Sequence, residues 1–175
     1  PYEDIEPEKI PAFFREKSYS SYRVYKSVFK EIHTLRPKSA GQKFDLQDYF
    51  DNPHKYDSVF NSYLPYLTVF VNCIFWTPKH PRLVTKDDLR RLYSLNKKPR
   101  LRVIGDISCD IEGAVECTLH VTKPDKPVYV YDPIEDKAVD GIQGRGPVVL
   151  AIDNLPAEIP LESSTYFSSA LKPYV

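Results

Sequence analysis

The pattern of apolar and polar residues sets a strand-rich second half of the chain apart from an irregular first half. Residues 68–76 read TVFVNCIFW, which is apolar apart from Thr68 and Asn72 and rich in β-branched and aromatic side chains. This composition favours a strand buried on both faces of a parallel sheet. Three further segments have the same character and are predicted to be strands: RLRVIGDIS (100–108), VYVYD (128–132) and PVVLAID (147–153).

Two helices are predicted around these strands. Thr85 and Asp88 have the spacing of a capping box, with Asp in the place that Glu usually holds, so a helix is expected to run from here to about Leu95. Three of its side chains are expected to face inward: Leu89, Leu92 and Tyr93. A closing helix is predicted from Leu161 to Lys172. This order of elements is typical of the α/β class, as a partial Rossmann-like parallel sheet flanked by helices.

The first 66 residues predict a helical and irregular N-terminal segment. An acidic, proline-punctuated lead-in covers residues 1–11. A helix is expected after Ser20 or Ser21, because four apolar side chains follow at spacings of three, four and three: Tyr22, Tyr25, Phe29 and Ile32. Beyond the loop 37–42, prolines at 53 and 65 interrupt alternating aromatic and acidic residues, which predicts short helical turns packed over a larger body.

Composition narrows the classes of partner. The 175 residues carry 24 basic and 24 acidic side chains, so the chain lacks the surplus of positive charge typical of nucleic-acid and anionic-lipid binders. The interleaved Tyr and Lys of residues 22–30 resemble a stacking platform for single-stranded nucleic acid, but an amphipathic helix explains them more simply. No apolar run approaches the roughly 20 residues of a membrane helix. We therefore expect no nucleic-acid and no membrane partner.

The cysteine count and the start of the chain bear on its compartment. Three cysteines give no disulfide framework and indicate a reducing compartment. The start shows no secretory signal and is too acidic for a mitochondrial presequence, so we expect the cytoplasm, or the mitochondrion if an upstream presequence exists. The sequence contains no methionine, which indicates a processed chain or an excerpt of a longer one.

Polar side chains gather at the ends of three predicted strands. They are Asn72 and Cys73; Asp106, Asp110 and Glu112; and Asp153 and Asn154. In open α/β sheets, ligands bind beyond the carboxyl ends of the strands. An acid there can orient a substrate amine, share a proton with a reacting group or bind a ribose. The alternative is that Asp106 and Asp110 only stabilise turns, which aspartate does well.

Several other chemistries find no support in the sequence. The glycines of GIQGRG (141–146) precede a strand instead of following one, so they indicate a tight turn and not a phosphate-binding loop. Cys109, Cys117 and His120 match no common zinc spacing, so no metal site is expected. The acids beside Cys109 make it a poor nucleophile, and no G-x-S-x-G elbow is present.

Three motifs together carry a family resemblance: VNCIFWTPKHPRLVTKDDL (71–89), GDISCDIEGAVECT (105–118) and AIDNLPAEIPLESSTYFSSALKPYV (151–175). In combination they resemble the carboxyl-terminal part of lysine-ketoglutarate reductase, the saccharopine-forming enzyme of lysine degradation, which is itself similar to alanine dehydrogenase and the transhydrogenases. The aromatic and acidic segment 44–60 fits the same branch. The resemblance implies two Rossmann-like domains with the active site between them. Residues 44–175 would form the second half of the nucleotide-binding domain, after a helical lead-in at 1–43.

The resemblance also implies roles for individual residues. Asp110 matches the acid that alanine dehydrogenases place beside the nicotinamide and the substrate, and is the expected catalytic residue. Asn154 matches an amide that lines the nicotinamide pocket. The expected cofactor-binding group is Asn72, Cys73, Ile74, Asp153 and Asn154. The implied reaction joins L-lysine and 2-oxoglutarate to give saccharopine, with NADPH as the expected cofactor and NADH as the alternative.

The chain omits other parts that the family carries upstream. These are the glycine fingerprint, the residue that reads the ribose 2′ position, and a lysine and histidine acid/base pair. The chain is therefore expected to be incomplete and inactive by itself, with a sheet edge that needs covering by the rest of the enzyme, a second copy or another chain. The competing interpretation is a non-catalytic module that binds a partner or regulates a complete reductase.

Overall fold

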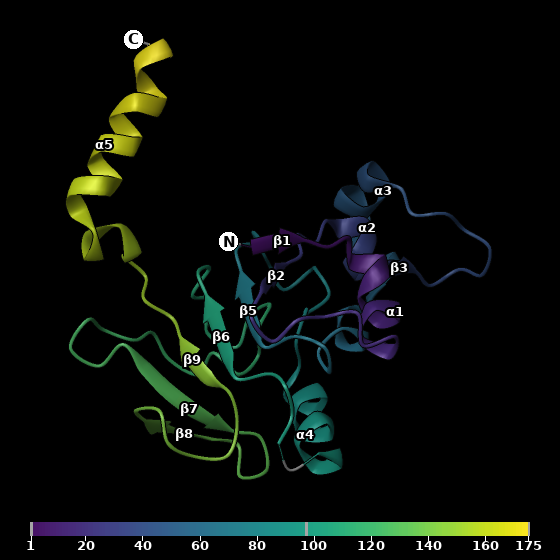
Figure 1. The fold of residues 1–175 in the computed structure, drawn as a ribbon. Coiled ribbons are helices and arrows are strands. Elements are labelled where there is room, and N and C mark those ends of the chain that lie inside the picture. Colours follow the sequence, from purple (N-terminus) through teal and green to yellow (C-terminus); the bar gives the residue numbers. More distant parts are fainter. Residues whose placement is uncertain (1, 97, 175) are drawn as a thin grey trace.

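Five strands form the central sheet of the computed structural model, which describes residues 2–96 and 98–174 (Figure 1). In spatial order they are β5 (Val69–Asn72), β6 (Val103–Asp106), β9 (Val148–Leu150), β7 (Val128–Asp132) and β8 (Lys137–Asp140). The strands β5, β6 and β9 are parallel, whereas β7 runs antiparallel to both β9 and β8. The predicted α/β class and the four predicted strands are confirmed. The hairpin strand β8 was not predicted from the sequence.

The helix α4 (Lys86–Leu95) begins where the sequence predicts. The side chain of Thr85 accepts a hydrogen bond from the Asp88 amide, and the Asp88 carboxylate accepts one from the Thr85 amide at 3.1 Å. Leu89 and Tyr93 are buried, and the Tyr93 hydroxyl donates to the Leu101 carbonyl at 2.6 Å. The predicted capping box and inward face are therefore confirmed, and they fix this helix to the strand that follows it.

The hydrophobic core lies on one face of the sheet. Phe70, Ile104 and Val149 are neighbours in the register of β5, β6 and β9, and all three are buried. Side chains from α4, from β7, from the segment before β5 and from the loops around β6 complete the cluster: Phe60, Leu64, Leu83, Val84, Leu89, Leu101, Val115, Cys117, Tyr129 and Tyr131. Burial of this apolar area is the main force that holds the sheet to its helix.

The opposite face of β5 is not covered. Val69 and Val71 are 54% and 55% exposed, and β5 is an edge strand that pairs only with β6 among the described residues. The prediction that residues 68–76 are buried on both faces is therefore wrong for this chain. Apolar side chains do point to both faces, as in parallel sheets with two covering layers, but the described residues supply a layer on one face only.

The N-terminal part forms small units beside the sheet (Figure 1). Its elements are β1 (Tyr2–Asp4), α1 (Ile10–Arg15), β2 (Val24–Lys26), α2 (Glu31–Thr34), β3 (Leu35–Pro37), α3 (Leu46–Asp51) and β4 (Tyr56–Ser58), with 3₁₀ turns at Pro7–Lys9, Pro53–Lys55 and Phe60–Ser62. The strands β1 and β2 are parallel, and β3 and β4 are antiparallel. The predicted short helical turns between residues 37 and 65 are confirmed.

The helix predicted after Ser20 or Ser21 is wrong. Residues 24–26 pair with β1 as a strand, and Tyr22, the first residue of the predicted apolar stripe, is 96% exposed. Ion pairs from Arg23 to Glu3 and from Lys26 to Asp4 accompany this pairing. The spacing of the aromatic residues fits a helix, but pairing with a distant strand decides the local structure.

The glycine-rich segment 141–146 forms the expected turn. Gly144 and Gly146 have φ values of +158° and +136°, and a Cβ atom at Gly146 would lie 1.8 Å from the Tyr131 carbonyl oxygen. Only glycine fits that close approach to β7. The segment therefore serves the chain reversal before β9.

The predicted closing helix is confirmed as α5 (Pro160–Leu171), between 3₁₀ turns at Leu155–Glu158 and Lys172–Tyr174. It extends away from the sheet, and none of its residues is buried (Figure 1). Leu161 and Tyr166 are 75% and 79% exposed. In the part of the chain that the structure describes, no helix has the length and apolar character to cross a membrane.

The packing of α4 predicts a contrast between two of its leucines. Leu89 is fully buried and Leu95 is 83% exposed. Leu89→Ala should lower the free energy of unfolding by about 2–5 kcal/mol, because it leaves a cavity in the core. Leu95→Ala should change it by less than about 0.5 kcal/mol. Urea denaturation of both variants measures the difference, and equal losses would contradict this packing.

Candidate functional site

The carboxylate of Asp106 joins the ends of the two strands β5 and β6. The residue is 1% exposed. Its Oδ1 accepts a hydrogen bond from Asn72 Nδ2 at 2.8 Å, and its Oδ2 accepts one from Thr118 Oγ1 at 2.5 Å. A buried carboxylate is costly unless such donors surround it. Of the two interpretations of Asp106, the geometry therefore supports a structural role, which ties three segments together at this edge of the sheet.

The segment that leaves β5 is tied to the segment that leaves β6. The Ile107 amide donates to the Asn72 carbonyl at 2.9 Å, and Ser108 Oγ donates to the Ile74 carbonyl at 2.5 Å. The Asn72 side chain is buried in these contacts, whereas Cys73 is exposed and Ile74 is 40% exposed. Cys73 and Ile74 are therefore the accessible residues of this predicted cofactor-binding segment.

Asp110 lies in a tight turn directly beyond β6. The Gly113 amide donates to the Asp110 carbonyl at 2.9 Å, and a Cβ atom at Gly113 would lie 2.4 Å from Asp110 Cβ. Cys109 and Glu112 have positive φ values of 55° and 49°. Asp110 is half-buried, and no side chain or amide among the described residues donates a hydrogen bond to its carboxylate. That carboxylate is available to a ligand at this edge.

Burial and the carboxylates at the ends of the strands β6 and β9 raise the pKa of the Cys109 thiol. The pKa of Cys109 is raised to about 11, first by burial of the thiol and then by the negative charges of Asp106, Asp153 and Asp110. The thiol also donates to the Asp106 carbonyl at 3.1 Å. The raised pKa agrees with the expectation that Cys109 is a poor nucleophile. Asp153, which follows β9, therefore lies near enough to the Asp110 turn to share its electrostatic environment.

The end of β9 is held by Thr122. Its amide donates to the Ala151 carbonyl at 2.8 Å, and its hydroxyl accepts from the Ala151 amide at 3.0 Å. Asp153 and Asn154 follow and are exposed, and the Asn154 carbonyl accepts from the Ala157 amide at 3.0 Å. The structure thus places Asp153 near Asp106 and Asp110. Among the described residues, Asn154 has no hydrogen bond to the Asp110 turn.

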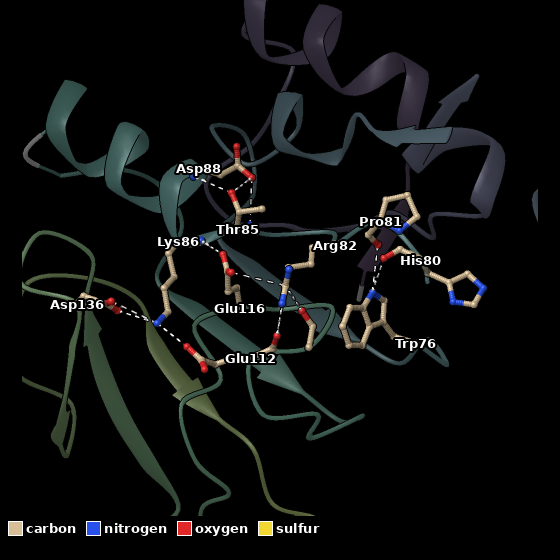
Figure 2. Close-up of polar contacts among 11 residues, drawn as sticks. Trp76, His80, Pro81, Arg82, Thr85, Lys86, Asp88, Glu112, Glu116 and Asp136 are labelled. Carbon is tan, nitrogen blue, oxygen red and sulfur yellow. Dashed lines mark hydrogen bonds and ion pairs between the residues drawn. The ribbon is translucent and has the colours of Figure 1, made fainter. Parts of the chain in front are cut away.

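One arginine at this edge was not singled out from the sequence. Arg82 Nη2 donates to the Glu112 carbonyl at 3.0 Å, and its Nε donates to the Gly113 carbonyl at 3.2 Å (Figure 2). The guanidinium also lies over the Trp76 ring, 5.5 Å from its centroid. The sequence places Arg82 in a proline-bounded loop, and only a contact with a segment 30 residues later gives it a role.

The same region contains a second basic contact and a shallow cavity. Lys86 Nζ binds Glu112 Oε1 at 2.6 Å and Asp136 Oδ1 at 3.1 Å, and the Glu112 hydrogen bond is the main reason that the pKa of Lys86 is raised (Figure 2). A cavity of about 300 Å³ is lined by Trp76, Pro78, His80, Pro81, Arg82 and Thr85. Among residues 2–96 and 98–174, no cluster of three or more His, Cys, Asp or Glu side chains is arranged to hold a metal ion.

Comparison with known proteins identifies long relatives of this chain. No family model matches it. The alpha-aminoadipic semialdehyde synthases of Bos taurus and Arabidopsis thaliana are 33% and 32% identical to it over its whole length, and the bovine protein is described as mitochondrial. The chain spans 20% and 17% of the lengths of these two proteins. The resemblance predicted from the motifs is confirmed as homology to the alpha-aminoadipic semialdehyde synthases.

Two further proteins match a smaller part of this chain or match it at lower identity. Saccharopine dehydrogenase [NAD(+), L-lysine-forming] of Emericella nidulans is 35% identical over 113 residues, which cover 60% of this chain and 26% of the dehydrogenase. A solved L-alanine dehydrogenase aligns with 99% of this chain and 36% of its own, with a TM-score of 0.43 and 15% identity. The last likeness is too distant to bear on function. The general class of the relatives is that of saccharopine dehydrogenase-type oxidoreductases.

The environment of Cys109 predicts slow alkylation. At pH 8 a thiol with a pKa of about 11 has roughly 100-fold less thiolate than an ordinary cysteine with a pKa of 9.0, and the thiolate is the reactive form. Iodoacetamide should therefore modify Cys109 far more slowly in the folded chain than in urea, with a rate that keeps rising to about pH 11. Mass spectrometry separates it from exposed Cys73. A folded-state rate that levels off near pH 9 would contradict this electrostatic environment.

Proposed function

From the homology of this chain to the lysine-ketoglutarate reductase region of the alpha-aminoadipic semialdehyde synthases, we propose that it is part of such a reductase. The complete enzyme would condense the ε-amine of L-lysine with the carbonyl of 2-oxoglutarate, with loss of water. Hydride from NADPH and one proton would then convert the imine to the secondary amine of saccharopine. The non-catalytic module remains the competing function.

The observation that carries this proposal is the carboxylate of Asp110 at the carboxyl ends of parallel strands, which receives no hydrogen bond from residues 2–96 and 98–174. This edge is where α/β sheets bind nucleotides and substrates. Asp110 is half-buried, and the segment 72–74, tied to the same edge, leaves Cys73 and Ile74 accessible. A nicotinamide cofactor supplies the hydride. The residues present fit its nicotinamide end, because they offer a carboxylate, amides and apolar surface but no glycine-rich phosphate loop.

Within this site, we assign the charge-bearing role to Asp110. A carboxylate beside a protonated imine stabilises its positive charge and orients its carbon toward the hydride donor. Cys73 and Ile74 would lie along the cofactor, with Asp153 and Asn154 on the β9 side. Asn72 would contribute through position, since its side chain is engaged by Asp106. NADPH is the proposed cofactor, and the NAD(+) in the name of the Emericella relative keeps NADH as the alternative.

We propose that the rest of a longer polypeptide covers the open side of the sheet. The edge strand β5 has no charged residue and no proline, and Val69 and Val71 expose an apolar face beside it. Such an edge is prone to pair with another strand. Residues 44–175 would then be half of a nucleotide-binding domain, after the lead-in 1–43. The name of the bovine relative favours the mitochondrial alternative for the compartment over the cytoplasm.

Replacement of Asp110 in the complete polypeptide tests the catalytic assignment. Asp110→Asn and Asp110→Ala should lower kcat by about 100-fold or more, since a preorganised charge partner of the reacting group is lost. Binding of NADPH and the far-ultraviolet circular dichroism should stay unchanged. Asp125→Ala, at an exposed loop position, is the matched control. Unchanged kinetics for both Asp110 variants would refute the assignment.

The proposed division of the enzyme gives a second test. The 175-residue chain alone should show no formation of saccharopine from lysine, 2-oxoglutarate and NADPH, because it carries only one side of the proposed cleft. The complete polypeptide should show it, measured by the loss of NADPH absorbance. Turnover by the short chain would contradict the division, and a complete polypeptide that binds a partner protein but never turns over would favour the regulatory module.

A further inference from the structure

The turn that carries Asp110 is not part of a helix or a strand. It follows β6 and contains two residues with positive φ, Cys109 and Glu112. Such conformations are unfavourable for residues other than glycine and persist only where the surroundings hold them. Gly113 lies so close to Asp110 that a Cβ atom there would be 2.4 Å from Asp110 Cβ. The Glu112 amide donates to the Thr118 carbonyl at 2.8 Å. The position of the Asp110 carboxylate therefore depends on what holds the far side of this turn.

The guanidinium of Arg82 holds that side. Its Nε and Nη2 both point at the Glu112 carbonyl, at 3.3 and 3.0 Å, and its Nε also lies 3.2 Å from the Gly113 carbonyl. Figure 2 shows the side chain reaching across to this backbone from the neighbouring loop. A planar guanidinium can bridge adjacent acceptors in a fixed geometry, which a lysine ammonium cannot reproduce. One side chain thus fixes two successive peptide carbonyls of the turn.

Arg82 is itself held in place. Its guanidinium lies over the Trp76 ring, and Trp76 Nε1 donates to the carbonyls of His80 and Pro81 at 3.1 and 3.3 Å. The next residues are bound to the same turn region, because the amides of Leu83 and Val84 both donate to the Ala114 carbonyl. The loop of residues 76–85 is therefore a firm support for the guanidinium.

This loop also begins at the other half of the proposed site. Trp76 follows the segment 72–74 by two residues, and Ser108 Oγ already ties Ile74 to the end of β6. Arg82, toward the far end of this loop, binds the Glu112 and Gly113 carbonyls of the turn that follows β6. The loop is therefore attached near both of its ends to the segment that leaves β6. Glu116 lies 3.7 Å from Arg82 Nε and accepts a hydrogen bond from the Lys86 amide at 2.8 Å. Glu116 therefore compensates the positive charge of Arg82, while the guanidinium still donates to the two carbonyls of the turn.

We infer that Arg82 is a positioning residue, which sets the place of the Asp110 carboxylate relative to the segment 72–74 through the Glu112 and Gly113 carbonyls. This inference rests on the proposed function. Arg82 does not need to touch the substrate or the cofactor. Its effect on the reaction passes through Asp110, because a displacement of about 1 Å in a reacting group can cost roughly 100-fold in rate.

Arg82→Met and Arg82→Lys in the complete polypeptide test this inference. Arg82→Met should lower kcat by about 100-fold with little change in the KM for lysine or in NADPH binding. Arg82→Lys should lose less, since an ammonium can still donate to one carbonyl. Hydrogen exchange of the amides of residues 110–116 should accelerate in both variants. Arg100→Met is the matched control, because Arg100 also lies over aromatic rings, Phe14 and Tyr19, but not at this edge.

A double-variant cycle separates positioning from a general structural role. In the Asp110→Asn background, Arg82→Met should add less than about a threefold further loss of kcat, because both changes remove the same contribution. Full additivity, or unchanged kcat in both Arg82 variants while Asp110→Asn is impaired, would overturn the inference and leave the proposed function intact. Unchanged kinetics in Asp110→Asn would refute the proposed function itself. If Arg82→Met does not fold, Arg82→Lys supplies the same cycle.

Discussion

The buried carboxylate of Asp106 is the interaction on which the candidate site depends. It joins Asn72 at the end of β5, Thr118 in the following loop and its own strand β6. An uncompensated charge in this place would be strongly unfavourable, so the hydrogen bonds from Asn72 and Thr118 stabilise this edge of the sheet. The segments that leave the strands therefore start from a fixed point, and the available groups, Asp110 and residues 73 and 74, extend from it.

Two kinds of residue surround that fixed point. Asp106 and Asn72 are buried and satisfied within the protein, whereas the carboxylate of Asp110 is half-buried and receives no hydrogen bond from the described residues. This division separates the acid that stabilises the fold from the acid that we propose to bind a ligand. The basic side chains Arg82 and Lys86 lie on the outer side of the turn, where they hold the backbone and Glu112 instead of neutralising Asp110.

The sequence predicted those elements that depend on residues close to one another in the chain. Thr85 and Asp88 gave the start of α4, and the strand predicted at 100–108 put Asp110 directly beyond the end of β6. The helix expected near Tyr22 failed because β1 lies twenty residues away in the sequence and pairs with that segment. Arg82 was missed for the same reason: its acceptors are carbonyls of a distant turn, and a backbone acceptor leaves no mark on the sequence.

We propose that this edge of the sheet is one wall of a hydride-transfer cleft, completed by a longer polypeptide. The most direct measurement is a crystal structure of the complete polypeptide with NADP⁺ and saccharopine bound. In that structure the Asp110 carboxylate should lie within hydrogen-bonding distance of the secondary amine of saccharopine. The nicotinamide should lie beside residues 73 and 74, and a further strand should pair with β5. Ligands bound elsewhere, with Asp110 facing only solvent, would contradict it.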